Sequence, residues 1–328
     1  NASPGGVIDL GETYLVYGRS NGFPASVTLD SAWLDSTNGV LFVGTHSDGH
    51  SGSSLAGAGD LNRDGYDDLC IGAPFAHPAG MYQAGEVYLV FGGDTALPAA
   101  ITLDAAWLNG SNGVLLAGAT NYQNVGSDIV LAGDVDADGY DDLLVGAPGA
   151  EPGGRNYAGE TYLVYGRAAG FPAHITLNSA WPDGSNGVAF AGNAVDLRSG
   201  SVVSFAGDVN ADGRDDFLIG AYGAAVGGAE NAGETYMIYG CAGGYPARVL
   251  LNTNWLDAYN GLVLQGQNYH DYSGAAVSAA GDVNADGYDD LLVAADGADG
   301  GDCAGETYLV YGQRTAIPAE PRRGAWTG

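Results

Sequence analysis

The sequence of 328 residues contains no lysine, and its ten arginines stand against 31 aspartates and eight glutamates, which gives a formal net charge of −29. A field of this sign repels nucleic acid and anionic lipid headgroups, and it favours cations as partners. No apolar run reaches about 18 residues, so we expect no insertion into a membrane. The three cysteines are too few for a disulfide framework, and no segment shows a convincing helical period.

Glycine is abundant, with 56 residues, and it lacks the three-residue period of collagen. Frequent turns are therefore expected. Hydrophobic residues make up 46% of the chain, which is enough to bury a large core. This composition predicts an all-β protein rather than a helical or disordered one.

An internal repeat of 74 residues organises the chain. It is marked by four aspartates at that interval, Asp60, Asp134, Asp208 and Asp282, and by tryptophans and glutamates spaced in the same way. We therefore expect a single repeat domain, residues 1–328. Its parts are an incomplete repeat (1–44), three full repeats (45–118, 119–192 and 193–266) and a final partial repeat (267–328).

Four extended runs, which we call A, B, C and D, recur along the chain. Examples are residues 127–132 (A), 142–147 (B), 159–165 (C) and 112–117 (D). In runs B and C the residues that point to either face of the sheet are apolar, so both faces of the sheet must be covered. Radial packing of such four-stranded antiparallel sheets is the β-propeller, and we predict blades of this kind; a stacked solenoid is the less favoured alternative.

The two ends of the repeat array do not match. The chain starts with runs C and D and finishes with runs A, B and C. If the ring closes within one chain, the D run at 38–43 completes the last sheet, and the C run at 11–17 is left as a spare strand that could pair with a neighbouring molecule. The four blades could equally belong to a larger ring.

Between runs A and B each repeat carries the pattern Asp-x-(Asn/Asp)-x-Asp-Gly-x-Asp-Asp. In a calcium loop of this spacing, the side chains at positions 1, 3 and 5 converge on one cation, glycine at position 6 permits the turn, and position 7 offers its carbonyl. Position 9 supplies a further carboxylate here. We therefore predict about four Ca²⁺ ions, held by Asp60, Asn62, Asp64, Tyr66, Asp68, Asp134, Asp136, Asp138, Tyr140, Asp142, Asp208, Asn210, Asp212, Arg214, Asp216, Asp282, Asn284, Asp286, Tyr288 and Asp290.

Asx-turns without metal are the alternative interpretation of these loops. Three or four carboxylates crowded into one short loop repel one another, and the crowding recurs four times. Ligands that are all oxygen favour calcium over zinc, and magnesium is disfavoured because it keeps its waters. Four Ca²⁺ ions would change the net charge from −29 to −21, since each adds two positive charges.

The A run, the acidic loop and the B run together resemble the FG-GAP repeats of the integrin α-subunit propeller and of bacterial integrin-like arrays. The Gly-Ala-Pro element is present as Gly72-Ala73-Pro74 and Gly146-Ala147-Pro148, and it is altered in the later repeats. The resemblance implies an extracellular or cell-surface propeller that calcium stabilises and that serves adhesion or recognition. It also implies that ligands bind on the face opposite the calcium loops.

The loops on that opposite face differ between repeats, which suggests a ligand surface or simple tolerance to change. One position of the D-to-A loop is occupied in turn by the candidate ligand-binding residues His50, Asn124, Arg198 and Tyr272.

We find no activated nucleophile and no acid/base pair, so we do not expect an enzyme. The favoured function is recognition of a protein or a glycan through the variable loops. The alternative is a self-assembling extracellular subunit, linked to copies of itself by strand donation into a filament or surface array. An accessory domain of a secreted hydrolase or lyase is a distant third interpretation.

Overall fold

The computed structural model describes residues 9–20, 22–57, 59–168, 170–178, 180–298 and 304–314. Within these ranges the chain forms 20 β-strands and two short 3₁₀ turns, η2 (Pro78–Gly80) and η3 (Pro152–Gly154). The described part contains no helix that is long and apolar enough to cross a membrane. The predicted all-β class is therefore confirmed.

The strands form five sheets, and we number the sheets in chain order. Sheet 1 contains β1 (Glu12–Val16), β2 (Gly39–Val43) and β6 (Ala100–Thr102). Sheet 2 contains β3 (Ser54–Gly57), β4 (Leu69–Ala73), β5 (Glu86–Val90), β7 (Gly113–Gly118) and β11 (His174–Leu177). Sheet 3 contains β8 (Ile129–Gly133), β9 (Asp142–Ala147), β10 (Glu160–Val164), β12 (Gly187–Ala191) and β16 (Arg248–Leu250).

The last two sheets have fewer strands than sheets 2 and 3 among the described residues. Sheet 4 contains β13 (Val202–Gly207), β14 (Asp216–Ala221), β15 (Glu234–Ile238) and β17 (Gly261–Gln265). Sheet 5 contains β18 (Ser273–Gly281), β19 (Asp290–Ala295) and β20 (Glu306–Val310). The predicted A, B, C and D runs are thus confirmed as four successive antiparallel strands in sheets 2, 3 and 4.

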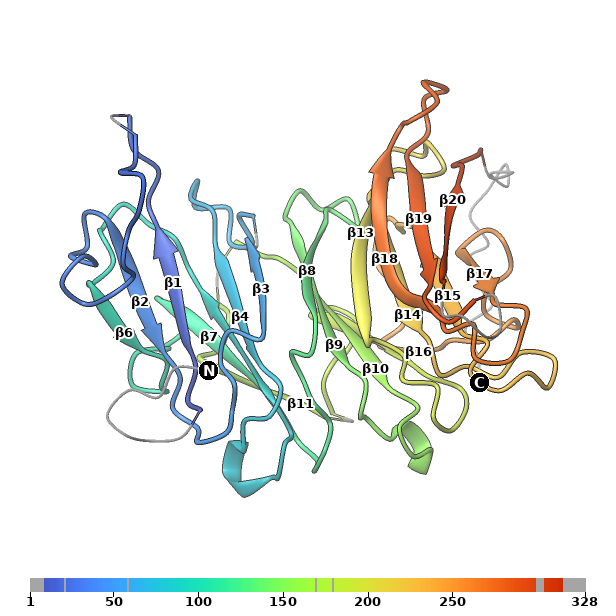
Figure 1. The fold of residues 1–328 in the computed structure, drawn as a ribbon, viewed down its shortest axis with the longest axis horizontal. Coiled ribbons are helices and arrows are strands. Elements are labelled where there is room, and N and C mark those ends of the chain that lie inside the picture. The colour runs from blue at the N-terminus through green and yellow to red at the C-terminus, as the bar shows by residue number, and fades with distance from the viewer. Residues whose placement is uncertain are drawn as a thin grey trace.

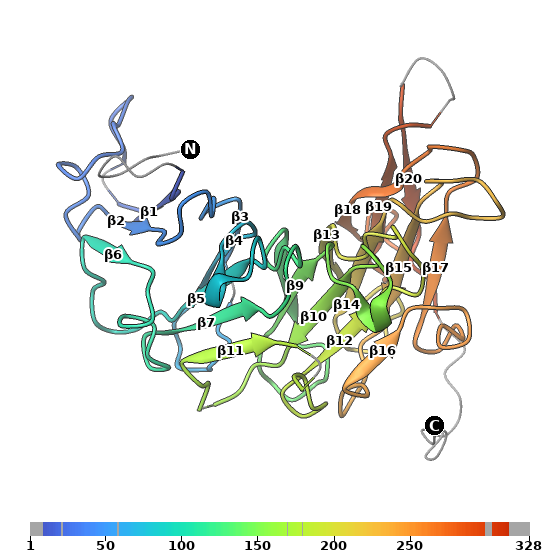
Figure 2. The same cartoon turned by 90° about the horizontal axis from the view of Figure 1, so that it is seen from below.

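The sheets are the blades of a propeller that is an open arc in the described residues. The A strands β3, β8, β13 and β18 lie side by side near its centre (Figure 1). Sheets 1 and 5 stand at the two ends of the arc, with a gap between them (Figure 2).

Three short outer strands were not predicted from the sequence. The connection from strand C to strand D runs out to the preceding blade, where it adds a parallel strand beside strand D. We call these three strands, β6 on β2, β11 on β7 and β16 on β12, the clasp strands. Each clasp ties a blade to the one before it.

The two ends of the array do not complete each other within the chain. Strand β2 pairs with β1 and with β6, and β20 pairs with β19. In the part of the chain that the structure describes, no pairing joins β2 to β20. The arrangement in which the D run at 38–43 completes the last sheet and leaves the C run at 11–17 spare is therefore wrong for this structure, because β1 holds β2 in sheet 1.

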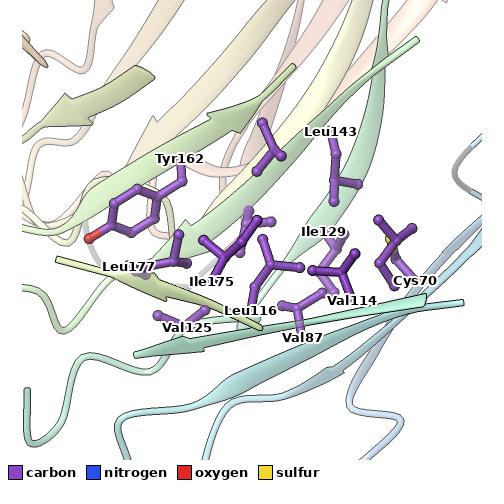
Figure 3. Packing of buried hydrophobic residues seen from close by; sticks show 14 of the residues in the cluster. Cys70, Val87, Val114, Leu116, Val125, Ile129, Leu143, Tyr162, Ile175 and Leu177 are labelled. Atoms are coloured by element: carbon purple, nitrogen blue, oxygen red, sulfur yellow. The ribbon is translucent and has the colours of Figure 1, made fainter. Parts of the chain in front are cut away.

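Buried side chains fill the space between neighbouring blades. The contact of sheets 2 and 3 contains Val87, Leu116, Leu143 and Tyr162, each fully buried (Figure 3). Strand β9 is buried at all six positions, as its apolar pattern on both faces requires. The thiols of Cys70 and Cys241 are free, and Cys303 lies outside the described residues.

Candidate calcium loops and ligand face

The four acidic loops connect β3 to β4, β8 to β9, β13 to β14 and β18 to β19, so all of them lie at the same end of the blades. The loop between β18 and β19 is at the top of Figure 1, and the 3₁₀ turns of the B-to-C connections are at the bottom. The fold therefore separates the candidate metal loops from the variable loops, as the resemblance to FG-GAP repeats implies.

Each loop is organised by hydrogen bonds from its own backbone. In the second loop, Asp134 accepts bonds from the N–H groups of Asp138 and Gly139, Asp136 accepts from Asp138, and Asp138 accepts from Tyr140. The same four bonds occur in every loop, at 2.8–3.1 Å. They hold the side chains of positions 1, 3 and 5 around one centre.

The backbone turns sharply at two places in each loop. Position 6 is glycine with φ of 86–93°, a region that glycine enters without steric cost. Position 4 also has positive φ, at Arg63, Ala137, Ala211 and Ala285. This shape brings the acidic side chains together, and carboxylate oxygens of Asp134, Asp136 and Asp138 lie within 4.8 Å of one another.

The second loop is the one with three carboxylates at these positions, because the other loops have asparagine at position 3. Asn62, Asn210 and Asn284 each direct their side-chain oxygen to the N–H of position 5, as Asp136 does. An amide oxygen is also a calcium ligand. The geometry of all four loops therefore suits a hard cation bound by oxygen.

The position-9 aspartates are buried and have a second task. The two carboxylate oxygens of Asp142 accept the N–H groups of Val135, in the loop, and of Gly166, just after β10. Asp68, Asp216 and Asp290 make the equivalent pairs of bonds. These residues tie each loop to strand C of its own blade, and their role as metal ligands stays a prediction.

Four of the loop carboxylates have a raised pKa and so hold a proton more tightly than usual. Burial raises the pKa of Asp142 to about 8, and the neighbouring Asp136 adds to the rise. Burial raises the pKa of Asp216 to about 8 and that of Asp68 to about 7. Burial and the charge of Asp138 raise the pKa of Asp136 to about 6. A bound cation would favour the ionised forms of these groups.

The third loop differs in having an arginine at position 7. The guanidinium of Arg214 lies 3.1 Å from the carboxylate of Asp212, which is position 5 of the same loop. The side chain of this arginine therefore places a positive charge beside a predicted metal ligand.

The position-8 aspartates form hydrogen bonds that join neighbouring loops. We did not predict these bonds from the sequence. The carboxylates of Asp141, Asp215 and Asp289 accept the N–H of position 1 in the preceding loop, at 3.2, 2.9 and 2.9 Å. A glycine precedes position 1 in each case, and a Cβ at Gly133 would lie 2.1 Å from the Asp215 carboxylate. This aspartate recurs in all four loops, and its recurrence could have indicated a shared role from the sequence alone.

On the opposite face, the four candidate ligand-binding residues share one backbone role. His50, Asn124, Arg198 and Tyr272 all have positive φ, between 52° and 57°. Their N–H groups donate to the backbone carbonyls of residues that lie just before the C strands β1, β5, β10 and β15. These residues are Asp9, Gln83, Tyr157 and Asn231. This position thus has the same backbone conformation and makes the same backbone hydrogen bond in all four repeats.

The structure brings two of these four side chains together. Arg198 and Tyr272 line a pocket of about 690 Å³, together with Asp196, Tyr222 and Glu230. His50 instead packs edge-on against Phe75, and the Asn124 amide donates to the carbonyls of Pro74 and Gln83.

Aromatic rings surround the arginine in this pocket. The Arg198 guanidinium lies 5.4 Å from the ring centre of Tyr157 and 6.0 Å from that of Tyr222. Tyr222 meets Tyr272 edge-on, and His270 stacks on Tyr272. The pocket thus combines ring faces with charged groups of both signs.

A glutamate begins each C strand on this face, and its partners are structural. The hydroxyl of Tyr88 donates to Glu86 at 2.7 Å, and that of Tyr162 donates to Glu160 at 2.5 Å. His46 also lies 3.3 Å from Glu86, and the side-chain hydrogen bond with this carboxylate raises the pKa of His46.

A family model described as FG-GAP repeat matches residues 51–90, 125–164 and 273–310. The chain contains FG-GAP repeats. Each matched segment runs from strand A through the acidic loop to strand C, and together they confirm the FG-GAP, integrin-like resemblance. The third loop, with Arg214, lies outside the matched FG-GAP segments but has the same hydrogen bonds.

Curated proteins similar to this chain include phospholipases D and integrin α-subunits. Phosphatidylinositol-glycan-specific phospholipase D of Bos taurus is 34% identical over 201 residues, which cover 60% of this chain and 22% of the relative. The Mus musculus protein of that name is 41% identical over 112 residues, 34% of this chain and 12% of the relative. Integrin alpha-5 of Xenopus laevis is 30% identical over 189 residues, 56% of this chain and 16% of the relative. The chain thus matches less than a quarter of each of these relatives.

Proposed function

We propose that this chain is a non-enzymatic, calcium-binding recognition module of the extracellular space or cell surface. The observation that carries the calcium part is the convergence of the Asp134, Asp136 and Asp138 carboxylates within 4.8 Å, in a loop whose hydrogen bonds recur in all four acidic loops. The observation that carries the recognition part is the pocket of Arg198 and Tyr272 on the opposite face.

Calcium fits the loops better than other metals. In each loop the side chains of positions 1, 3, 5 and 9 and the carbonyl of position 7 would hold the ion, and all of these donors are oxygen. When bound, the ion neutralises the carboxylates and stabilises the folded loop, because the unfolded chain has no assembled site. The loop in turn positions the ends of strands A and B of its blade.

A glycan is the ligand that we would test first. The pocket offers ring faces of Tyr222 and Tyr272 for stacking, and it offers Asp196, Arg198 and Glu230 as hydrogen-bond partners for hydroxyl groups. Some relatives are named for a phosphatidylinositol-glycan, which agrees with this choice. A protein ligand is the second candidate, because the other relatives are integrin α-subunits.

Binding of the chain to arrayed glycans in calcium-containing buffer tests this proposal. The R198A and Y272A variants should lose at least about tenfold in affinity for any ligand that the wild-type chain binds, because each removes a contact of roughly 1.4 kcal/mol or more. Y259A is the matched control, because Tyr259 is an exposed tyrosine on the calcium side of the arc. Equal affinities for all three variants would reject this pocket as the binding site.

The absence of catalysis is also part of the proposal. Among the described residues, His46 forms an ion pair with a carboxylate, that of Glu86. Glu86 is buried and accepts a hydrogen bond from the Tyr88 hydroxyl. These contacts give Glu86 a structural role in orienting neighbouring side chains. An accessory role beside a separate hydrolase or lyase domain remains compatible with the proposed binding function.

A further inference from the structure

Neighbouring acidic loops share the aspartate at position 8. In the third loop, Asp215 stands between Arg214, whose carbonyl is a predicted calcium ligand, and Asp216, whose carboxylate is another. The carboxylate of Asp215 accepts the N–H of Asp134, the position-1 residue of the second loop, at 2.9 Å. One residue therefore has its backbone in the third loop and its side chain on the second. The same contact recurs at the other two junctions between loops, through Asp141 and Asp289.

This contact leaves little space around the shared aspartate. A Cβ added to Gly133, which precedes Asp134, would lie 2.1 Å from a carboxylate oxygen of Asp215 and 2.5 Å from its Cγ. Gly133 also has a positive φ of 73°, a conformation that glycine adopts without steric cost. At the other two junctions the Cβ would lie 2.3 and 2.1 Å from the aspartate oxygen. The aspartate and the start of the preceding loop therefore have to move together.

The start of the preceding loop is where its predicted ligands are organised. The carboxylate of Asp134 accepts the N–H groups of Asp138 and Gly139. Oxygens of Asp134, Asp136 and Asp138 lie within 4.8 Å of one another. By holding the backbone of Asp134, Asp215 acts on the predicted ligands of a loop to which it does not belong.

A backbone route runs beside this side-chain contact. The Asp216 carboxylate accepts the N–H of Gly240 at 2.7 Å, and the next residue, Cys241, donates its N–H to the Val135 carbonyl at 2.9 Å. The N–H of Val135 donates in turn to Asp142 at 3.0 Å. An unbroken chain of bonds thus joins the position-9 aspartates of the third and second loops. The other two junctions have the same chain, through Gly166, Arg167 and Leu61 and through Gly312, Gln313 and Val209.

We propose that the position-8 aspartates are positioning residues that couple neighbouring calcium loops, so that calcium in one loop raises the affinity of the next. The inference rests on the proposed calcium binding. Without a cation, the carboxylates of each loop repel one another, which favours loosening of the loop. Positions 7 and 9 of the third loop, once they hold a cation, fix Asp215 between them, and Asp215 fixes the N–H of Asp134.

The second loop then has less conformational freedom to lose when it binds its own cation, which is positive cooperativity. The effect is reciprocal, because the coupling free energy is the same whichever loop fills first. Repulsion between two divalent cations acts in the opposite direction. The negative charge of the Asp215 carboxylate at the junction reduces that repulsion.

Calcium titration of the whole chain by calorimetry tests the coupling of the second and third loops. The position-5 aspartate is replaced by alanine in each loop that is to be disabled. One chain keeps both loops, a second keeps the second loop alone, and a third keeps the third loop alone. The constant for filling both loops, divided by the product of the two single-loop constants, is the coupling factor. In this order the chains are D64A/D286A, D64A/D212A/D286A and D64A/D138A/D286A.

We expect a coupling factor of at least about five, the lower end of the usual range for coupled sites. D215A, added to all three chains, should lower the factor at least about threefold, the effect of one weak hydrogen bond on an equilibrium. D215N should retain most of the factor, because an amide oxygen can still accept the N–H of Asp134. D215N also provides the test if D215A does not fold.

D141A is the matched control. Asp141 occupies position 8 of the second loop, but its carboxylate bonds to Asp60 in the first loop, which is disabled in all three chains. D141A should therefore leave the coupling factor unchanged. If D141A lowers the factor as much as D215A does, the effect belongs to each loop and not to the contact between loops, and the role of Asp215 is overturned.

The other outcomes separate this inference from the calcium binding on which it rests. If none of the three chains binds calcium, the proposed calcium loops are wrong and the coupling is wrong with them. If calcium binds but the factor is one or less, or if D215A leaves it unchanged, calcium binding stands and the coupling through Asp215 is overturned. A D215N chain that behaves like D215A would assign the coupling to charge and overturn the role of the hydrogen bond.

Discussion

The carboxylate of Asp215 accepts a hydrogen bond from the backbone N–H of Asp134 at 2.9 Å, although 81 residues separate them in the sequence. The two residues belong to the loops of neighbouring blades, so this bond joins two candidate metal loops directly. Equivalent bonds join Asp60 to Asp141 and Asp208 to Asp289. The four loops therefore form a connected row along one side of the arc.

Removal of one link in this row should loosen the blades that it joins. We expect Asp215→Ala to lower the free energy of unfolding by about 1–3 kcal/mol, because the N–H of Asp134 loses a charged acceptor. Thermal melting in calcium measures the change. Asp67→Ala removes the same residue type from the same loop position and should leave the melting temperature of the single chain unchanged. Equal losses for both variants would show that the effect belongs to each loop and not to the contact between loops.

The second loop should lose its ion when one converging carboxylate is removed. We expect Asp138→Ala to reduce the number of calcium ions bound per chain by one, because Asp138 stands at position 5 beside Asp134 and Asp136. Titration calorimetry gives the stoichiometry, and melting with and without chelator gives the stabilisation by calcium. His50→Ala is the control and should change neither quantity. An unchanged stoichiometry for Asp138→Ala would contradict the assignment of this loop.

The shape of the candidate metal loops could be predicted from the sequence because the hydrogen bonds that form it are local. The side chains of Asp134, Asp136 and Asp138 converge through bonds to backbone groups no more than five residues away. The strands could be predicted for the same reason, since burial on both faces of β9 appears as an unbroken apolar run.

Contacts between blades could not be predicted in the same way. The clasp strand β11 has four residues and pairs with β7 of the preceding blade, so its partner is fixed by the arrangement of the blades and not by its own pattern. Asp215 looks like any turn aspartate until the neighbouring loop is placed beside it. The grouping of Arg198 with Tyr272, and not with Asn124, likewise depends on how adjacent blades pack.

The stability of the calcium-free chain should fall as the pH rises. Burial raises the folded-state pKa of Asp142 and Asp216 to about 8, above the value of about 3.9 expected in the unfolded chain. The folded state therefore holds these protons more tightly, so their contribution to stability is complete below about pH 4 and is lost as the pH rises through about 8. Melting temperatures in chelator should decrease over this range.

Calcium should reverse the disadvantage at high pH, because the ion favours ionised carboxylates. The calcium-induced rise in melting temperature should therefore be larger at pH 8 than at pH 5. In chelator, Asp142→Asn should show a shallower dependence on pH than the wild type, since an amide does not titrate. A wild-type chain whose melting temperature in chelator increases between pH 5 and pH 8 would contradict the raised pKa values.

The third loop should bind calcium more weakly than the others because Arg214 holds a positive charge 3.1 Å from the carboxylate of Asp212. The side chain of Arg214 is partly exposed, so solvent reduces its effect, and we expect Arg214→Ala to strengthen this site by roughly threefold to tenfold, the range of a partly screened charge contact. Titration calorimetry with calcium measures the change. The reciprocal variant, Tyr140→Arg, places the same side chain in the second loop and should weaken that site to a similar degree. If Arg214→Ala weakens the third site instead, the guanidinium orders Asp212 for the ion, and its charge does not compete with calcium.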